Sequence, residues 1–202
     1  MINEILEGIP SFSEELGLDL KKPEDRFKWF IASILFAKPI SFKIASKTFG
    51  LFLIHGLTSP EKILDAGWDR LVELLDAGGY VRYDFSTASN ILETVKALKE
   101  KYGSLEKLHN EAKNSKDLER KLMEFKGVGK TAVNIFLREL RGIWEKAKPK
   151  PSKIALSMAE KLRVDAEKYE SKLVRIYLEY CKKKRCEVCP VVDYCFHSIP
   201  CR

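Results

Sequence analysis

The sequence lacks most of the features that mark membrane, secreted or disordered proteins. No run approaches the roughly 20 consecutive apolar residues that cross a bilayer. The first residues, from Met1 to Glu7, do not form a basic stretch followed by an apolar core, so no secretory signal is predicted. Hydrophobic residues make up 45% and charged residues 32% of the chain, which is typical of a folded protein. We expect a cytoplasmic monomer, associated with the nucleoid in a prokaryote, that has no membrane partner.

Net charge is absent from the first two thirds of the chain. Residues 1–140 carry 21 basic and 21 acidic side chains, while residues 141–202 carry 15 basic and 8 acidic ones, so the whole net charge of +7 lies in the last third. A localised positive surface favours a polyanion such as nucleic acid. A solvated charged face is the alternative interpretation.

Alternating apolar and polar residues, the pattern of a half-buried strand, are also lacking. Apolar residues between 26 and 140 instead recur at helical spacing, as in the stripe from Phe27 to Leu35 and in the stripe of Ile91, Val95 and Leu98. Two prolines, Pro149 and Pro151, cannot continue a helix and separate the chain into two parts. The sequence therefore predicts an all-α fold with a loop near residue 150.

Cysteine is missing from the first 180 residues, and all five cysteines lie in the last 22: Cys181, Cys186, Cys189, Cys195 and Cys201. In a reducing compartment, such clustering favours a metal site over disulfides. The spacing alone leaves a four-thiolate zinc site and an iron-sulfur cluster equally open, with disulfides as a third reading.

A basic run lies between the first two of these cysteines, at Lys182, Lys183, Lys184 and Arg185. A metal-bound loop would hold these cations in place, so we expect them to contact phosphates. A solubilising surface run is the alternative.

The segment from Leu122 to Leu137 contains a glycine pair that brackets one apolar residue, Gly127-Val128-Gly129, between two apolar helical stretches. Such a turn directs backbone amides and a helix N-terminus outward, which suits a phosphate. Phe125 and Val128 are expected to pack inward. A nucleotide-binding P-loop would need a glycine where Glu124 stands, so the alternative is a plain helix cap followed by a new helix.

This segment, Leu-x-x-Phe-Lys-Gly-Val-Gly followed by Ala-Val-Asn-Ile-Phe-Leu, resembles the helix-hairpin-helix of the DNA glycosylase superfamily named for that motif and its Gly/Pro-Asp loop. The likeness runs from about Phe27 through Cys195, and it is greatest to the endonuclease III type. That type carries a C-terminal [4Fe-4S] loop with Cys-x6-Cys-x2-Cys-x5-Cys spacing. The last three ligands match Cys186, Cys189 and Cys195, whereas the gap from Cys181 is two residues shorter, so Cys201 is the alternative fourth ligand.

The resemblance implies two helical lobes with a DNA-binding cleft between them. One lobe would comprise residues 26–140, with the hairpin in 118–137. The other would comprise residues 1–25 and 141–202, with the cluster loop in 181–195. Double-stranded DNA is the implied partner, and a [4Fe-4S] cluster, or zinc in its place, is the implied cofactor. The hairpin gives the expected DNA contacts Lys126, Gly127, Val128, Gly129, Lys130 and Thr131. The stretch from Gly79 to Asp84 resembles a family loop that inserts into the gap left by the flipped base, so Tyr80 or Tyr83 is the expected wedge or stacking platform, with aromatics packed inward as the alternative. Lys38 lies where the family often carries a residue that enters the duplex at the lesion.

The catalytic residues of the superfamily do not transfer to this chain. The position of the essential aspartate falls near Pro151-Ser152-Lys153, where no acid stands, and the position of the lyase lysine falls on Thr131, one residue after Lys130. We nominate Asp84 as the acid and Lys130 as the amine, with a phosphate contact as the alternative role of Lys130. Two function classes follow. One is a DNA N-glycosylase, with or without strand cleavage at abasic sites, and the other is a DNA-binding damage sensor without chemistry.

Overall fold

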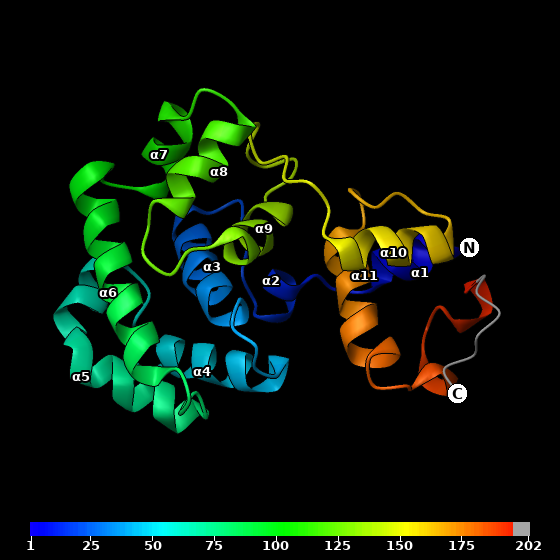
Figure 1. Cartoon of the computed structure of the whole chain (residues 1–202), viewed down its shortest axis with the longest axis horizontal. Helices are drawn as coiled ribbons and strands as arrows, with labels where there is room; N and C mark the ends of the chain where they lie inside the picture. The colour runs from blue at the N-terminus through cyan, green and yellow to red at the C-terminus, as the bar shows by residue number, and fades with distance from the viewer. Residues whose placement is uncertain (196–202) are drawn as a thin grey trace. The chain divides into compact units, whose positions relative to one another are not determined.

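The computed structural model describes residues 1–195, and these residues form helices and connecting loops without a β-strand. The all-α prediction is confirmed for this part of the chain. The helices, coloured from blue to red along the chain in Figure 1, are α1 Ile2–Gly8, α2 Phe12–Glu15, α3 Pro23–Phe36, α4 Phe42–Ile54, α5 Pro60–Gly78, α6 Asp84–Lys101, α7 Leu105–Glu111, α8 Ser115–Met123, α9 Lys130–Arg138, α10 Lys153–Leu162 and α11 Glu170–Ile176.

The chain divides into two compact units, one of which is built from both ends of the sequence. Unit 1 comprises residues 1–15 and 150–202, and unit 2 comprises residues 16–149. We expected the same interleaved arrangement with boundaries at 26 and 140. The observed boundaries place the first turns before α3 and the loop after α9 in unit 2.

Helix α3 lies at the centre of unit 2, where it packs against α4, α7 and α9. It begins with Pro23 at its first position and has acidic residues in its first turn, both of which favour a helix start. Its side chains Trp29, Phe30 and Ile34 are fully buried. Trp29 Nε1 donates to the Phe136 carbonyl oxygen at 3.2 Å, which ties α3 to α9. The predicted apolar stripe of this helix is therefore core.

Helices α5 and α6 form an antiparallel pair that packs beside α4. Gly79 ends α5 in the left-handed region, at φ 95°, as helix C-caps commonly do. At the other end of the pair, Lys99 Nζ lies 2.6 Å from Glu61 Oε1. Helix α5 is not continuous, because Gly67 interrupts it with φ 73° and ψ −179°.

The core of unit 1 brings the N-terminal helix α1 onto the helices that follow the proline loop. Leu6 packs with Met158, Leu162 and Leu173, all of them buried. Arg175 joins the chain ends further, since its Nη1 donates to the Pro10 carbonyl oxygen at 2.9 Å and its Nη2 lies 2.8 Å from Glu15 Oε2. After α11 the chain continues through a π-helical turn, Tyr177–Cys181, and two 3-10 turns, Cys186–Val188 and Val192–Tyr194.

None of the helices within residues 1–195 combines the length and the apolar character needed to cross a membrane.

Candidate nucleic-acid interface

The glycine pair lies in the turn between α8 and α9, residues 124–129, which we call the hairpin turn, where the sequence places it. Phe125 and Val128 are each 3% exposed, and the Val128 amide donates to the Phe125 carbonyl oxygen at 3.1 Å. Phe125 makes edge contacts with Phe30 and Tyr102, at ring centroid distances of 6.1 and 6.2 Å. The apolar residues thus anchor the turn in the core of unit 2, which leaves its glycines and cations on the surface.

Gly127 is a glycine because the chain itself requires one. Its φ is 80°, a conformation that other residues rarely adopt. A Cβ atom at this position would lie 2.6 to 2.8 Å from side-chain atoms of Asn90 on α6. Thr94 Oγ1 donates to the Lys126 carbonyl oxygen at 2.9 Å, so α6 holds the turn at two successive points. The backbone conformation and the packing against α6 therefore require a glycine at this position.

Gly129 differs from Gly127 in its backbone conformation and in the space around it. Its φ of −90° and ψ of −179° are extended backbone that any residue adopts, and a Cβ built on it would meet no atom within 4 Å. Gly129 is the N-cap of α9, and it has no side chain that could accept from the first amides of the helix. The turn therefore presents a helix N-terminus with open space in front of it, which suits a closely approaching anion.

The cations beside this helix end differ in how far their charge is already compensated. Lys126 Nζ lies 2.7 Å from Glu93 Oε1, so a carboxylate of α6 offsets its charge. Lys130 and Thr131 are exposed in the first turn of α9, and Lys130 makes no ion pair within residues 1–195. Lys130 is thus the lysine of the turn with an uncompensated charge.

A second cationic cluster lies where α3 ends and α6 begins. Lys38 Nζ lies 5.9 Å from the ring centroid of Tyr83, and Arg82 Cζ lies 5.5 Å from the same ring. Tyr83 occupies the N-cap of α6, seven residues before Asn90. Because seven residues make about two helical turns, Tyr83 and Asn90 share one face of α6, the face that contacts the hairpin turn. Two of the predicted wedge residues, Lys38 and Tyr83, are therefore brought together.

Tyr80 corrects the prediction of a stacking platform. Its side chain is 1% exposed, and its hydroxyl donates to the Leu35 carbonyl oxygen at 2.5 Å. Burial, together with the neighbouring Tyr83, raises the pKa of Tyr80. Tyr80 anchors the loop to α3 and is not accessible to a base, so of the two tyrosines only the half-buried Tyr83 retains the role.

Asp84 is the first residue of α6, and its Oδ1 accepts from the Phe85 amide at 2.7 Å. It precedes Asn90 by six residues, which places it roughly 120° around the helix from the face that contacts the hairpin. Asp84 and the hairpin turn thus lie on different faces of α6. The catalytic assignments of Asp84 and Lys130 remain predictions.

An acid that the sequence analysis missed lies beside the loop where the resemblance puts one. Ser152 caps α10, its hydroxyl accepting from the Ala155 amide at 3.3 Å. The Ser152 amide donates to Glu170 Oε1 at 2.8 Å, and Glu170 is 1% exposed. Glu170 begins α11, 18 residues along the chain. No spacing rule predicts this contact, because it depends on how α10 and α11 pack.

The cysteine loop places its thiols in different environments. Cys181 and Cys189 are half-buried and pack against the core of unit 1, whereas Cys195 is exposed. Cys181 Sγ lies 3.9 Å from Met158 Sδ. Burial, followed by the neighbouring Cys189 thiol, raises the pKa of Cys181, and burial raises the pKa of Cys189. These two thiols are protonated at neutral pH in the metal-free chain.

The donor set is chemically suited to a thiolate-bound cofactor, but the described arrangement does not form a complete site. Cys181, Cys189 and Cys195 are free thiols. Within residues 1–195 no three Cys, His, Asp or Glu side chains are gathered in a way that could hold a metal ion. Cys201, the alternative ligand, lies outside the described residues. A cofactor would need the thiols drawn together.

All four members of the basic run are exposed. Their backbone is held by main-chain hydrogen bonds, since the Lys182 amide donates to Tyr177 O at 2.8 Å and the Arg185 amide donates to Tyr180 O at 2.9 Å. Lys184 adopts φ 54°, which is uncommon outside glycine. Lys182, Lys183, Lys184 and Arg185 therefore project from a tight turn at the end of the π-helical segment.

Comparison with known proteins finds a likeness that covers most of the chain. No protein-family model matches the chain. The chain is 27% identical, over an alignment of 194 positions, to a protein of Methanocaldococcus jannaschii named "Putative DNA repair glycosylase". The alignment covers 85% of this chain and 86% of that protein. The likeness therefore extends over nearly the whole of both chains.

Proposed function

We propose that this protein acts in DNA repair and that it removes a damaged or mismatched base from duplex DNA by cleaving the N-glycosidic bond. The named relative supports a repair role over most of the chain length. The observation that carries the proposal is Gly129, a glycine that neither its backbone nor its packing requires, at the exposed N-terminus of α9. A DNA phosphate that approaches this helix end would account for the missing side chain.

The grip on DNA would begin with this phosphate. The first amides of α9, the Thr131 hydroxyl and the Lys130 ammonium group surround the space in front of Gly129 and would donate to phosphate oxygens. Such contacts position the duplex without reading its sequence. They also make binding salt-dependent, because each neutralised phosphate releases counterions.

Tyr83 and Lys38 would act on the bases. They lie at the end of the α6 face that contacts the hairpin, so a strand held at Gly129 could extend toward them. An aromatic ring backed by two cations can stack on a base and stabilise the neighbouring phosphates. We assign Tyr83 as the stacking residue and Lys38 as the side chain that enters the duplex at the lesion.

Cleavage of the glycosidic bond leaves positive charge on the sugar, and a carboxylate can stabilise that charge. We propose Glu170 as the acid that substitutes for the missing aspartate, acting through Ser152, with Asp84 as the candidate that touches the sugar directly. Glu170 accepts from the Ser152 amide beside the N-cap of α10 and is itself buried, so its influence on the sugar would be indirect. Lys130 is the candidate amine for attack on an abasic sugar if the protein also cleaves the strand.

For the cysteine loop we propose a [4Fe-4S] cluster bound by Cys181, Cys186, Cys189 and Cys195, with zinc as the alternative. When bound, the cluster would supply a rigid structural centre for unit 1. The chain's own part is to keep Cys181 and Cys189 against an apolar core and to present the basic run to phosphates. Anaerobically purified protein should be brown and contain about four iron atoms per chain. A colourless protein with one zinc ion per chain would assign zinc instead.

The decisive activity test uses duplex oligonucleotides that each carry one uracil, thymine mismatch, oxidised base, alkylated base or abasic site. Alkali converts a removed base into a strand break, so cleavage at one or more of the base lesions after incubation and alkali treatment supports the glycosylase. The abasic duplex breaks in alkali by itself and is therefore scored without alkali, for strand cleavage by the protein. Borohydride trapping then tests the amine. A covalent adduct that disappears in Lys130→Ala supports Lys130, and an adduct that persists points to another amine.

The absence of an acid at Pro151-Ser152-Lys153 favours a second candidate function, a damage sensor that binds DNA without cleaving it. Tight duplex binding with no cleavage on any substrate would select the sensor.

A further inference from the structure

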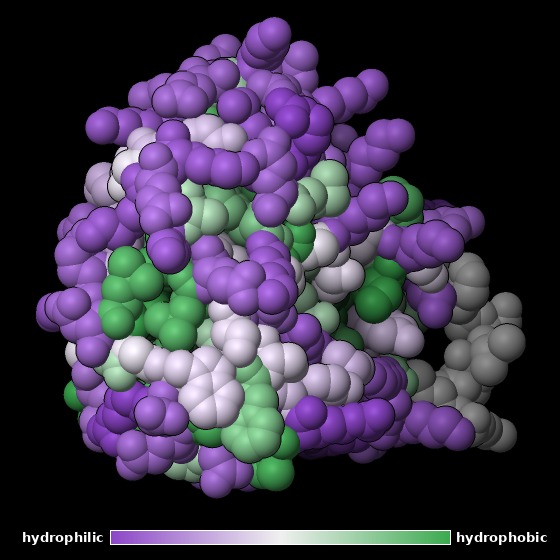
Figure 2. Space-filling view, turned by 60° about the vertical axis from the view of Figure 1, so that its left-hand side comes forward, coloured by the Kyte–Doolittle hydropathy of each residue, from purple (hydrophilic) through white to green (hydrophobic). Residues whose placement is uncertain are grey.

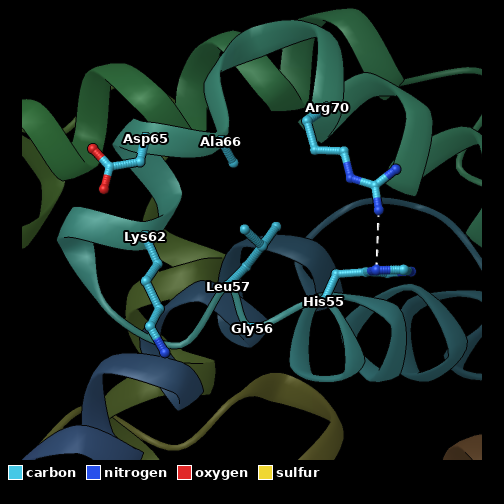
Figure 3. A pocket seen from close by; sticks show the side chains of 7 residues that line it. All are labelled: His55, Gly56, Leu57, Lys62, Asp65, Ala66 and Arg70. Carbon is cyan, nitrogen blue, oxygen red and sulfur yellow. Dashed lines mark hydrogen bonds between the residues drawn. The ribbon is translucent and has the colours of Figure 1, made fainter.

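A cavity of about 470 Å³ opens between the C-terminal end of α4 and the first part of α5, in unit 2. It is wide at its mouth, so a ligand held here would keep part of its surface in contact with solvent. Figure 3 shows its lining: Leu57 and Ala66 occupy the centre, Lys62 lies on one side and the pair of Arg70 and His55 lies on the other. The DNA-binding proposal above uses none of these residues.

Two glycines in the left-handed region shape this cavity. Gly56, at φ 73°, turns the chain after α4, and Gly67, also at φ 73°, breaks α5 between Ala66 and Arg70. A Cβ atom at either glycine would meet nothing within 4 Å. Packing therefore does not require these glycines. The backbone conformation does, and at Gly67 it is one that only glycine adopts readily.

The polar groups of the cavity are mainly donors. Arg70 Nη2 lies 3.0 Å from His55 Nδ1, and because a guanidinium group has no acceptor, Nδ1 accepts and the imidazole proton resides on Nε2. Arg70 Nη1 also forms an ion pair with Glu73 Oε2 at 2.5 Å, which fixes the guanidinium group in place and offsets part of its charge. The remaining donors are the other guanidinium N–H groups, the imidazole Nε2–H and the Lys62 ammonium group.

The centre of the cavity is apolar. Leu57 is 6% exposed, and Figure 3 shows its side chain beside the Ala66 methyl group, while the Asp65 carboxylate points away from them. A small apolar patch, with Lys62 on one side and Arg70 on the other, is suited to a ligand that combines a planar ring with a phosphate group.

We propose that this cavity is a binding site for a 5′-nucleotide, with the base against Leu57 and Ala66 and the phosphate on Arg70 and His55. The nucleotide can be a free mononucleotide or the 5′-phosphorylated end of a nucleic acid strand. This site is independent of the proposed repair function and stands if that function fails.

The test follows the histidine ring signals in ¹H–¹³C spectra of the full chain, which has three histidines. His55→Gln assigns the His55 signal. The probes are 5′-AMP, adenosine and inorganic phosphate, followed by a short single strand with either a 5′-phosphate or a 5′-hydroxyl end. We expect 5′-AMP to shift the His55 signal in a saturable way and adenosine to leave it unchanged at the same concentration.

Arg70→Gln should weaken the 5′-AMP response at least tenfold, whereas Lys116→Gln, which removes an exposed cation on α8, should not change it. If Arg70→Gln lowers the melting temperature strongly, Lys62→Gln provides the same comparison. A strand whose 5′-phosphate end shifts His55 when its 5′-hydroxyl counterpart does not assigns the strand end, and a response to 5′-AMP alone assigns the free nucleotide. The proposal is overturned by an unchanged His55 signal with every phosphate probe, by adenosine binding as well as 5′-AMP, or by unaltered binding in the cation variants.

Discussion

The hairpin turn of unit 2 and the cysteine loop of unit 1 are both short segments that follow a helix. They differ in how far the packing of the folded chain explains which residue types they contain. In the hairpin, the packing of Phe125, Gly127 and Val128 accounts for almost every residue type. In the cysteine loop, packing against the core of unit 1 does not explain why four residues are cysteines or why four consecutive residues are cations. Figure 2, which shows one face of the molecule, is coloured hydrophilic over most of its described surface, so an exposed charge by itself distinguishes neither region. The informative residues are those whose type the fold does not require.

Gly127 gives the largest expected effect. In Gly127→Ala, the new methyl group meets Asn90 and the backbone must hold φ 80°, so we expect a loss of about 3 kcal/mol or more in the free energy of unfolding. Urea titration followed by circular dichroism measures this loss. Asn90→Gly in the same chain removes the side chain that clashes and should restore part of the stability. Unchanged stability in Gly127→Ala would show that the turn is not packed against α6 as described.

The second largest effect is expected at Glu170, on the rate of base excision. Glu170→Gln keeps an oxygen for the Ser152 amide but removes the charge, so we expect base excision to slow by about 10²-fold while duplex affinity stays the same. Single-turnover rates on the preferred lesion measure it. Asp84→Asn is the matched variant: a loss there, with Glu170→Gln near normal, would assign the acid to Asp84.

Lys130 should influence affinity and its salt dependence. Lys130→Ala is expected to weaken binding to all duplexes alike and to reduce the slope of log K against log salt by about one. Fluorescence anisotropy at several salt concentrations gives the slope. Lys116→Ala, at the far end of α8, is the control and should change neither quantity. A loss confined to one DNA sequence would contradict a phosphate contact.

The smallest effect concerns pH and lies outside both regions. The His109 ring stacks on Trp144 at 4.6 Å, and burial, followed by the charge of Lys146, lowers the pKa of His109 below its ordinary value of 6.5. The unfolded chain therefore binds the proton more readily, so His109 contributes stability above pH 6.5 that is lost as the pH falls through and below that value. Melting temperatures of the wild type and His109→Phe between about pH 7.5 and 5.5 should diverge, with the wild type falling more steeply. Parallel curves would exclude His109 as the cause.

The sequence predicts those parts of the molecule that depend on local spacing. The buried face of α3, the inward Phe125 and the break near Pro149 follow from periodicity and from backbone chemistry. The burial of Tyr80 was not predictable, because a loop residue has no periodicity and its hydroxyl partner, the Leu35 carbonyl oxygen, is 45 residues away. The break at Gly67 was missed for a related reason: the apolar pattern of α5 continues through it.

The residues of the candidate site also divide into those that local spacing predicts and those that depend on packing between helices. The positions of Gly127, Gly129 and Lys130 are properties of one segment and were predicted. The contact of Glu170 with Ser152 depends on the packing of two helices, and the identity of the cofactor proposed for the cysteine loop depends on an atom that the sequence does not encode. A spacing of thiols can name a class of metal site, but selection among its members requires the geometry of the occupied site.

The central claim, that open space at Gly129 is reserved for a DNA phosphate, is tested most directly by Gly129→Ala. Because the backbone there is extended and no atom lies within 4 Å of the new methyl group, the free energy of unfolding should change by no more than about 1 kcal/mol. Duplex affinity measured on the same preparation at fixed salt should fall at least tenfold, since the methyl group occupies the approach to the α9 amides. Wild-type affinity in a variant that is equally stable would contradict the account.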